Sequence, residues 1–78
     1  MKNATIRLQF TGDYNGDLFR VWQQLKPFRT QYHVSIYDKQ ITAGTFYMEC
    51  TGFGFRGLND MISLLQREYK FNLLITKL

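Results

Sequence analysis

Three segments of the chain alternate polar and apolar residues, and this alternation restricts the fold more than any other feature of the sequence. Successive side chains of a β-strand point to opposite sides of a sheet, so an alternating run indicates a strand with one buried face. The alternating runs cover residues 5–10, 32–37 and 45–51, and the run 71–76 is typical of a fourth strand. Residues 17–26 and 58–70 instead repeat apolar side chains at helical spacing, which predicts two amphipathic helices.

The resulting order βαββαβ predicts an α+β fold, the ferredoxin-like α/β sandwich, with both helices on one face of a four-stranded antiparallel sheet. Residues 1–78 are expected to form this single domain. The strand positions on the helix side predict a core of Ile6, Leu8, Phe10, Val34, Ile36, Phe46, Met48, Cys50, Leu73 and Ile75. No further helix is predicted to cover the other face, which we call the open face. By alternation it carries Arg7, Gln9, His33, Ser35, Tyr37, Tyr47, Glu49, Thr51, Asn72, Leu74 and Thr76.

Length and composition exclude several classes of protein. A chain of 78 residues is too short for a two-domain enzyme or a complete dinucleotide-binding fold. Cys50 is the only cysteine and His33 the only histidine, so we expect no disulfide framework, no metal site and no cofactor. No run approaches the ~18 apolar residues of a membrane span, and no leader pattern is visible. We therefore expect a soluble, cytoplasmic protein without a membrane partner, drawn to acidic partners by its net charge of +4.

The open face contains the first candidate binding residues, Arg7, His33, Tyr37 and Tyr47. Aromatic rings stack on nucleic-acid bases, and arginine pairs with phosphates, so these side chains are compatible with RNA or DNA. Tyrosine and arginine are also favoured anchors of protein interfaces, which makes a partner protein or a homodimer the second interpretation. A solvated sheet face is the third, because strands favour tyrosine in any case. Glu49 at the centre of the face argues against nucleic acid.

The segment Gly52-Phe53-Gly54-Phe55, at the end of the third strand, resembles the core of the RNA-recognition-motif octapeptide. The resemblance implies that Phe53 and Phe55, which are in phase with Tyr47, extend the open face. Arg56 beside them is a further candidate binding residue. The alternative is a tight strand-to-helix turn over 52–57, in which the glycines permit positive φ and both rings pack inward.

The turn before the first helix, residues 12–20, resembles the signature loop of the acylphosphatase family, which has the same βαββαβ order. The matching positions are Gly12, Gly16, Phe19 and Arg20. The resemblance implies that the amides of Asn15–Leu18 cradle a phosphoryl group, that Arg20 clamps it, and that Asp38 stands near the family's water-orienting asparagine. A carboxylate at Asp17 would repel that group. The structural alternative is a turn in which Asn15 or Asp17 caps the helix.

Taken together, these features predict a small non-enzymatic binding or regulatory module. It would engage an acidic macromolecule, nucleic acid or protein, through the open face and basic residues. Two alternatives stay open from the sequence: a phosphate-handling hydrolase of acylphosphatase type, which would use Arg20 and Asp38, and a small-ligand regulatory domain that uses the turn at residues 12–20.

Overall fold

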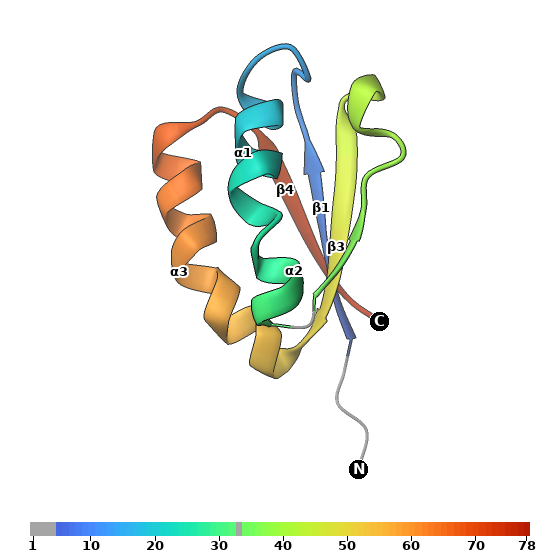
Figure 1. Ribbon diagram of the computed structural model, residues 1–78, viewed down its shortest axis with the longest axis vertical. Coiled ribbons are helices and arrows are strands. Elements are labelled where there is room, and N and C mark those ends of the chain that lie inside the picture. The colour runs from blue at the N-terminus through green and yellow to red at the C-terminus, as the bar shows by residue number, and fades with distance from the viewer. Residues whose placement is uncertain (1–4, 33) are drawn as a thin grey trace.

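The four strands of the protein form one antiparallel sheet in the order β2-β3-β1-β4, as shown by a computed structural model that describes residues 5–32 and 34–78. The elements along the chain are β1 (Thr5–Thr11), α1 (Asp17–Leu25), α2 (Phe28–Gln31), β2 (Ser35–Tyr37), η1 (Ile41–Ala43), β3 (Thr45–Thr51), α3 (Gly52–Glu68) and β4 (Asn72–Lys77). Among the described residues, all three α-helices lie on one side of the sheet, and no helix lies on the other side (Figure 1). The predicted ferredoxin-like α+β fold is therefore confirmed.

The core lies between the sheet and the helices. The two central strands, β1 and β3, pair so that Leu8 faces Met48 and Phe10 faces Phe46. The rings of Phe10 and Phe46 stack with centroids 4.7 Å apart. The buried apolar residues are Ile6, Leu8, Phe10, Leu18, Val21, Leu25, Val34, Ile41, Phe46, Met48, Cys50, Leu58, Ile62 and Leu65.

The core prediction was wrong at the edges of the sheet. Ile36 in β2 and Leu73 in β4 are only partly buried, and Ile75 is 49% exposed although it faces the helix side. An edge strand has a neighbour on one side only, so an inward-pointing side chain there keeps part of its surface in water. Alternation alone reports the face of a residue and not its distance from the edge.

The first helix begins without the predicted side-chain cap. Gly16 is the N-cap of α1, and neither Asn15 nor Asp17 caps it. The Asp17 carboxylate instead accepts a hydrogen bond from the Lys70 backbone N–H at 2.7 Å, which ties the start of α1 to the connection between α3 and β4. Pro27 follows the end of α1, and the chain then forms one more helical turn, α2.

The glycine-rich segment after β3 is helical, so the prediction of a loop over 52–57 was wrong. Helix α3 begins at Gly52 and continues directly from β3. Gly54 is buried where a Cβ atom would lie 3.2 Å from the Tyr32 carbonyl oxygen and 3.2 Å from Cys50 Cβ. The glycine here permits close packing of the helix start.

Gly44 holds the connection between β2 and β3 against the turn that follows β1. Its φ of 94° lies in the left-handed region, and a Cβ atom there would lie 2.7 Å from the Gly12 carbonyl oxygen. The Gly12 N–H donates to the Gly44 carbonyl at 3.0 Å. Both the backbone conformation and the close approach therefore require glycine.

Candidate functional site

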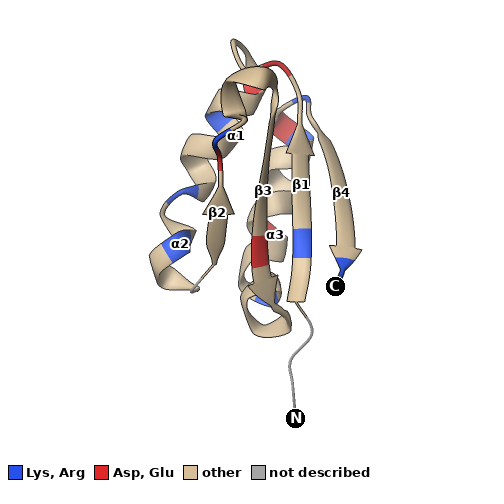
Figure 2. Cartoon of the chain, turned by 90° about the vertical axis from the view of Figure 1, so that its right-hand side faces the viewer, with Lys and Arg blue, Asp and Glu red and all other residues tan. Residues whose placement is uncertain are grey.

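The open face is the candidate functional site, and its centre contains one ion pair. Arg7 on β1 lies directly opposite Glu49 on β3. The arginine Nε and Nη2 donate to the same glutamate oxygen, Oε2, at 3.0 and 2.8 Å. Figure 2 views this face and shows the basic and acidic positions side by side on the two central strands. The pair leaves the centre of the face without net charge.

Three side chains stack across the face in a row that we call the Arg7–Tyr47–Tyr37 stack. The Arg7 guanidinium carbon lies 4.9 Å from the centroid of the Tyr47 ring. The rings of Tyr47 and Tyr37 are stacked with centroids 4.9 Å apart and an angle of 23° between their planes. The row therefore spans β1, β3 and β2, and Tyr37, at its end on the edge strand, is 44% exposed.

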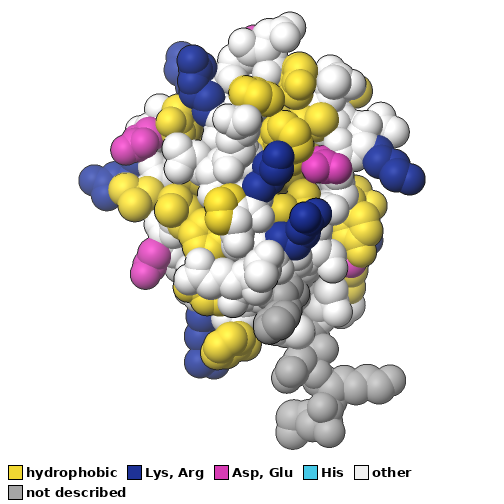
Figure 3. Space-filling view, viewed as in Figure 1, with side chains coloured by type: hydrophobic (Ala, Val, Ile, Leu, Met, Phe, Trp, Pro, Cys, Tyr) yellow, Lys and Arg dark blue, Asp and Glu magenta, His cyan; other side chains and the backbone are white. Residues whose placement is uncertain are grey.

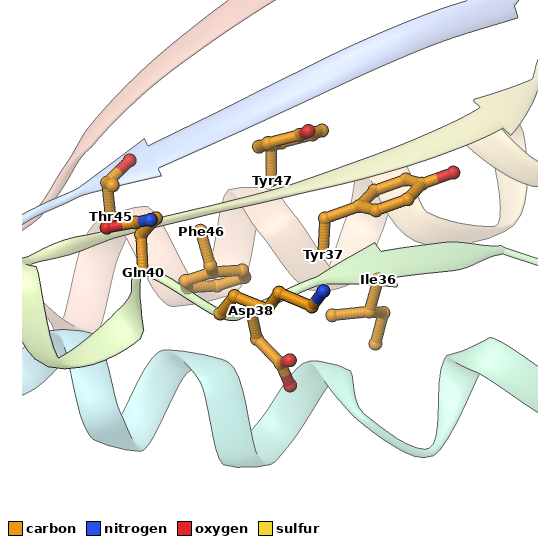
Figure 4. A pocket seen from close by; sticks show the side chains of 8 residues that line it. Ile36, Tyr37, Asp38, Gln40, Thr45, Phe46 and Tyr47 are labelled. Carbon is orange, nitrogen blue, oxygen red and sulfur yellow. The ribbon is translucent and has the colours of Figure 1, made fainter.

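A hollow of about 420 Å³ lies beside this stack, where β2 and β3 meet. Figure 4 shows Tyr37 and Tyr47 on the open side of the strands and Phe46 and Asp38 on the side of α1. The lining residues are Ile36, Tyr37, Asp38, Lys39, Gln40, Thr45, Phe46 and Tyr47. The Asp38 carboxylate accepts a hydrogen bond from Trp22 Nε1 at 3.1 Å, so its charge is directed toward the helix layer.

Several predicted binding residues lie away from the open face. Phe53 and Arg56 are in α3, where Phe53 is 73% exposed, so the expected extension of the open face by this segment was wrong. Phe55 packs against the core. His33 lies outside the described residues. Figure 3, which has the same view as Figure 1, shows Lys and Arg side chains scattered over the visible face and not gathered in one patch.

Three of the four backbone amides of residues 15–18, in the turn at residues 12–20, already donate hydrogen bonds within the turn. The N–H groups of Gly16 and Leu18 donate to the Asp13 carbonyl at 3.0 and 3.2 Å, and the Asn15 N–H donates to the Asp13 side chain at 3.1 Å. Arg20 lines a shallow hollow with Tyr14, Asn15, Gly16, Phe19 and Gln23. Asp38 lines the separate hollow beside Tyr37. The structure therefore does not gather Arg20 and Asp38 in one pocket.

Sequence reasoning missed the partners of two site residues. It placed Arg7, Tyr37 and Tyr47 on one face, and the structure brings these three together. It did not predict that Glu49 binds Arg7. Alternation places both residues on the same face, but they lie opposite each other in only one register of β1 and β3. It also did not predict that Asp38 accepts a hydrogen bond from Trp22, whose partly buried ring packs against the core with the Lys26 ammonium 4.5 Å from its centroid.

Other chemistry-bearing groups are sparse. Burial raises the pKa of the Cys50 thiol above its ordinary value, which keeps the thiol protonated and unreactive at neutral pH. Across residues 5–32 and 34–78, no cluster of His, Cys, Asp or Glu could hold a metal ion. None of the helices in these ranges is long and apolar enough to span a bilayer. Comparison of the chain with protein-family models, curated proteins and solved structures gives no significant match.

Proposed function

We propose that the protein is a non-enzymatic binding module that docks a partner protein on its open face, with the Arg7–Tyr47–Tyr37 stack at the centre of the contact. The observation that carries this proposal is the engagement of Arg7 by Glu49 through two hydrogen bonds. It leaves a surface whose centre is aromatic and without net charge. The cores of protein interfaces are depleted in charge and enriched in tyrosine and arginine.

The same geometry disfavours nucleic acid as the partner. Phosphate binding would require Arg7 to leave Glu49, and the freed carboxylate would repel the phosphates nearby. Tyr47 already has Arg7 against its ring on one side and Tyr37 stacked on it, so a base could not stack on it without displacing a neighbour. The net charge of +4 still attracts an acidic protein at long range.

Leu74 adds an apolar contact to this surface. It lies on the open face, opposite Gln9, and is 60% exposed. An exposed leucine on the same face as the aromatic row, with Gln9 between Leu74 and Tyr47, suits a partner surface that offers apolar side chains with a polar rim. A phosphate backbone offers no such group.

A photo-crosslinking experiment tests the proposal. A benzophenone amino acid at position 37 should capture one partner protein from cells, and the same group at position 53 on α3 should not. The purified partner is then titrated against the wild type, Tyr37→Ala and Phe53→Ala. We expect Tyr37→Ala to raise the Kd at least about tenfold, because tyrosines at interface centres are common hot spots. Phe53→Ala matches it as an exposed aromatic truncation away from the site.

Two results would overturn the proposal. One is a purified partner that binds Tyr37→Ala as tightly as the wild type. The other is a short single-stranded RNA that shifts the NMR signals of Tyr37 and Tyr47 with an affinity that falls steeply as salt rises, which is the signature of phosphate contacts.

The acylphosphatase-type alternative requires that backbone amides in the turn at residues 12–20 be free to bind a phosphoryl group. To cradle a phosphoryl group, the amides of Asn15, Gly16 and Leu18 would first have to release Asp13. Hydrolysis of a simple acyl phosphate that is abolished by Arg20→Ala would support this alternative. Phosphate-induced NMR shifts confined to residues 12–20, without hydrolysis, would instead favour a small-ligand regulatory domain.

A further inference from the structure

We propose that the protein forms a homodimer through the outer edge of β4, so that the sheets of two copies join into one continuous antiparallel sheet. The contact runs along the strand edge and shares Leu74, but not the Arg7–Tyr47–Tyr37 stack, with the surface proposed above, so the proposal goes beyond the partner protein and does not depend on it.

The two edges of the sheet differ in a way that points to β4. Strand β2 is short, with three residues, and is followed by Asp38 and Lys39. Strand β4 has six residues, no proline and a charge only at its last residue, Lys77. Figure 2 shows β4 at the margin of the sheet, with no described segment beyond it. Natural proteins usually blunt such an edge with charges, prolines or short strands, because an uninterrupted edge pairs with other strands.

Both faces of β4 expose apolar side chains. Leu74 on the open face is 60% exposed, and Ile75 on the helix side is 49% exposed. The corresponding helix-side residue of the neighbouring strand, Leu8, is fully buried. A strand that exposes apolar groups on both faces lacks a neighbour along its edge, and a second strand there would cover both groups at once.

The hydrogen-bond pattern between β1 and β4 shows which backbone N–H and C=O groups of β4 point away from β1. The Leu78 N–H donates to the Thr5 carbonyl at 2.8 Å, so Thr5 and Leu78 form a hydrogen-bonded pair. Such pairs alternate along an antiparallel ladder. The N–H and C=O groups of Leu73, Ile75 and Lys77 therefore point away from β1 toward the outer edge.

A second copy of β4 satisfies these groups in one particular register. Pairing about a two-fold axis keeps each face continuous only if residues of the same parity lie opposite one another. With Leu74 opposite Leu74 of the copy, Leu73 lies opposite Ile75 in a hydrogen-bonded pair, and Asn72 lies opposite Thr76. Over residues 72–76, apolar residues then meet apolar residues on both faces and polar residues meet polar ones, while Lys77 lies opposite Phe71 of the copy.

Strand β4 carries little charge that would oppose pairing with its own copy. Lys77 is the only charged residue of the strand, and antiparallel pairing places the two Lys77 side chains at opposite ends of the shared ladder. The same register places Lys77 of one copy opposite Phe71 of the other, next to its Lys70, so repulsion between lysines at each end of the ladder adds to the long-range repulsion between two chains of net charge +4. Salt screens that repulsion, so the dimer should tighten or stay unchanged as salt rises.

A charge-swap experiment tests both the dimer and its register. Sedimentation equilibrium should show the wild type dimerising with concentration. Leu74→Lys and Leu74→Glu should each raise the dimerisation Kd at least about tenfold, because each places like charges directly opposite at the axis. An equimolar mixture of these two variants should dimerise again, since opposite charges then meet. The same pair of substitutions at Leu64 on α3, which is 51% exposed, is the matched control and should change nothing.

Hydrogen exchange gives an independent readout. In the dimer, the amides of Leu73 and Ile75 should gain protection as protein concentration rises, while the amides of Leu74 and Thr76 should be protected at every concentration. A wild type that stays monomeric at millimolar concentration would overturn the proposal. So would a dimer that survives Leu74→Lys, or variants that fail to associate when they are mixed.

Discussion

The helix-covered face and the open face of the sheet are built from alternate residues of the same two strands, yet they have opposite characters. On the helix side, Phe46 and Met48 of β3 are completely buried. On the other side, Tyr47 and Glu49 stay partly exposed and take part in a stack and an ion pair. The difference shows that adjacent residues of one strand have different roles: one packs in the core, and the next lies on the surface proposed for binding. Substitutions on one face should therefore affect folding, and those on the other should affect binding.

Of the neighbours Phe46 and Tyr47, truncating the buried Phe46 should have the larger effect on the free energy of unfolding. Phe46→Ala removes a fully buried ring that stacks on Phe10, and we expect it to lower the free energy of unfolding by about 3–5 kcal/mol. A domain of this size has only roughly 4–12 kcal/mol in total. Tyr47→Ala on the open face should cost only about 1 kcal/mol, because it loses a partly exposed stack. Urea unfolding of both variants measures the difference, and equal losses would show that the open face contributes to the core.

A second comparison sets the connection between β2 and β3 against the start of α3. Gly44→Ala should lower the free energy of unfolding by about 2 kcal/mol, because alanine at positive φ is strained and its Cβ would press on the Gly12 carbonyl. Gly52→Ala is the matched control, because nothing lies within 4 Å of its Cβ position and the residue is helical. Thermal unfolding should show a lower midpoint for the first variant and an unchanged or higher one for the second. The reverse order would contradict the role of Gly44.

The smallest effect on stability, and the sharpest on binding, should come from Glu49→Gln. A partly exposed ion pair contributes at most about 1 kcal/mol, so unfolding should change little. The substitution frees Arg7 and makes the open face basic, so affinity for a short single-stranded RNA should rise above that of the wild type. Asp60→Asn, which makes the same charge change on exposed α3, is the control. Fluorescence anisotropy measures both, and equal gains would mean that net charge alone acts.

The strand and helix pattern of this chain was readable because it depends on neighbouring residues. The alternation in 5–10 and 45–51 predicted β1 and β3 almost to the residue. The helical spacing from Leu58 onward predicted most of α3 but missed its first turns, because three glycines there indicated a loop. In the folded chain, Gly54 and Gly57 are needed because Tyr32 packs against that part of the helix. That contact joins residues far apart in the sequence.

The candidate site was predictable only in part, for the same reason. Parity placed Arg7, Tyr37 and Tyr47 on one face, but the stack among them requires a specific order of strands. The pairing of Arg7 with Glu49 requires a specific register as well. A shift of the register would have left Arg7 without its partner and the face with a free positive charge. The interpretation of the face as protein-binding rather than phosphate-binding therefore could not come from parity alone.

By itself, the sequence determined the order of the four strands and the two longer helices, the buried face of each central strand, and the absence of a predicted helix over the opposite face. Those properties follow from the periodic placement of apolar side chains, and this periodicity can be read within each short segment of the sequence. Only the tertiary structure decided that Glu49 pairs with Arg7 and that β4 exposes both Leu74 and Ile75. It also decided that Asp17 accepts a hydrogen bond from the Lys70 backbone and Asp38 one from Trp22. These depend on which segments become neighbours. Distant residues become neighbours only when the whole chain packs together, and periodicity contains no information about that.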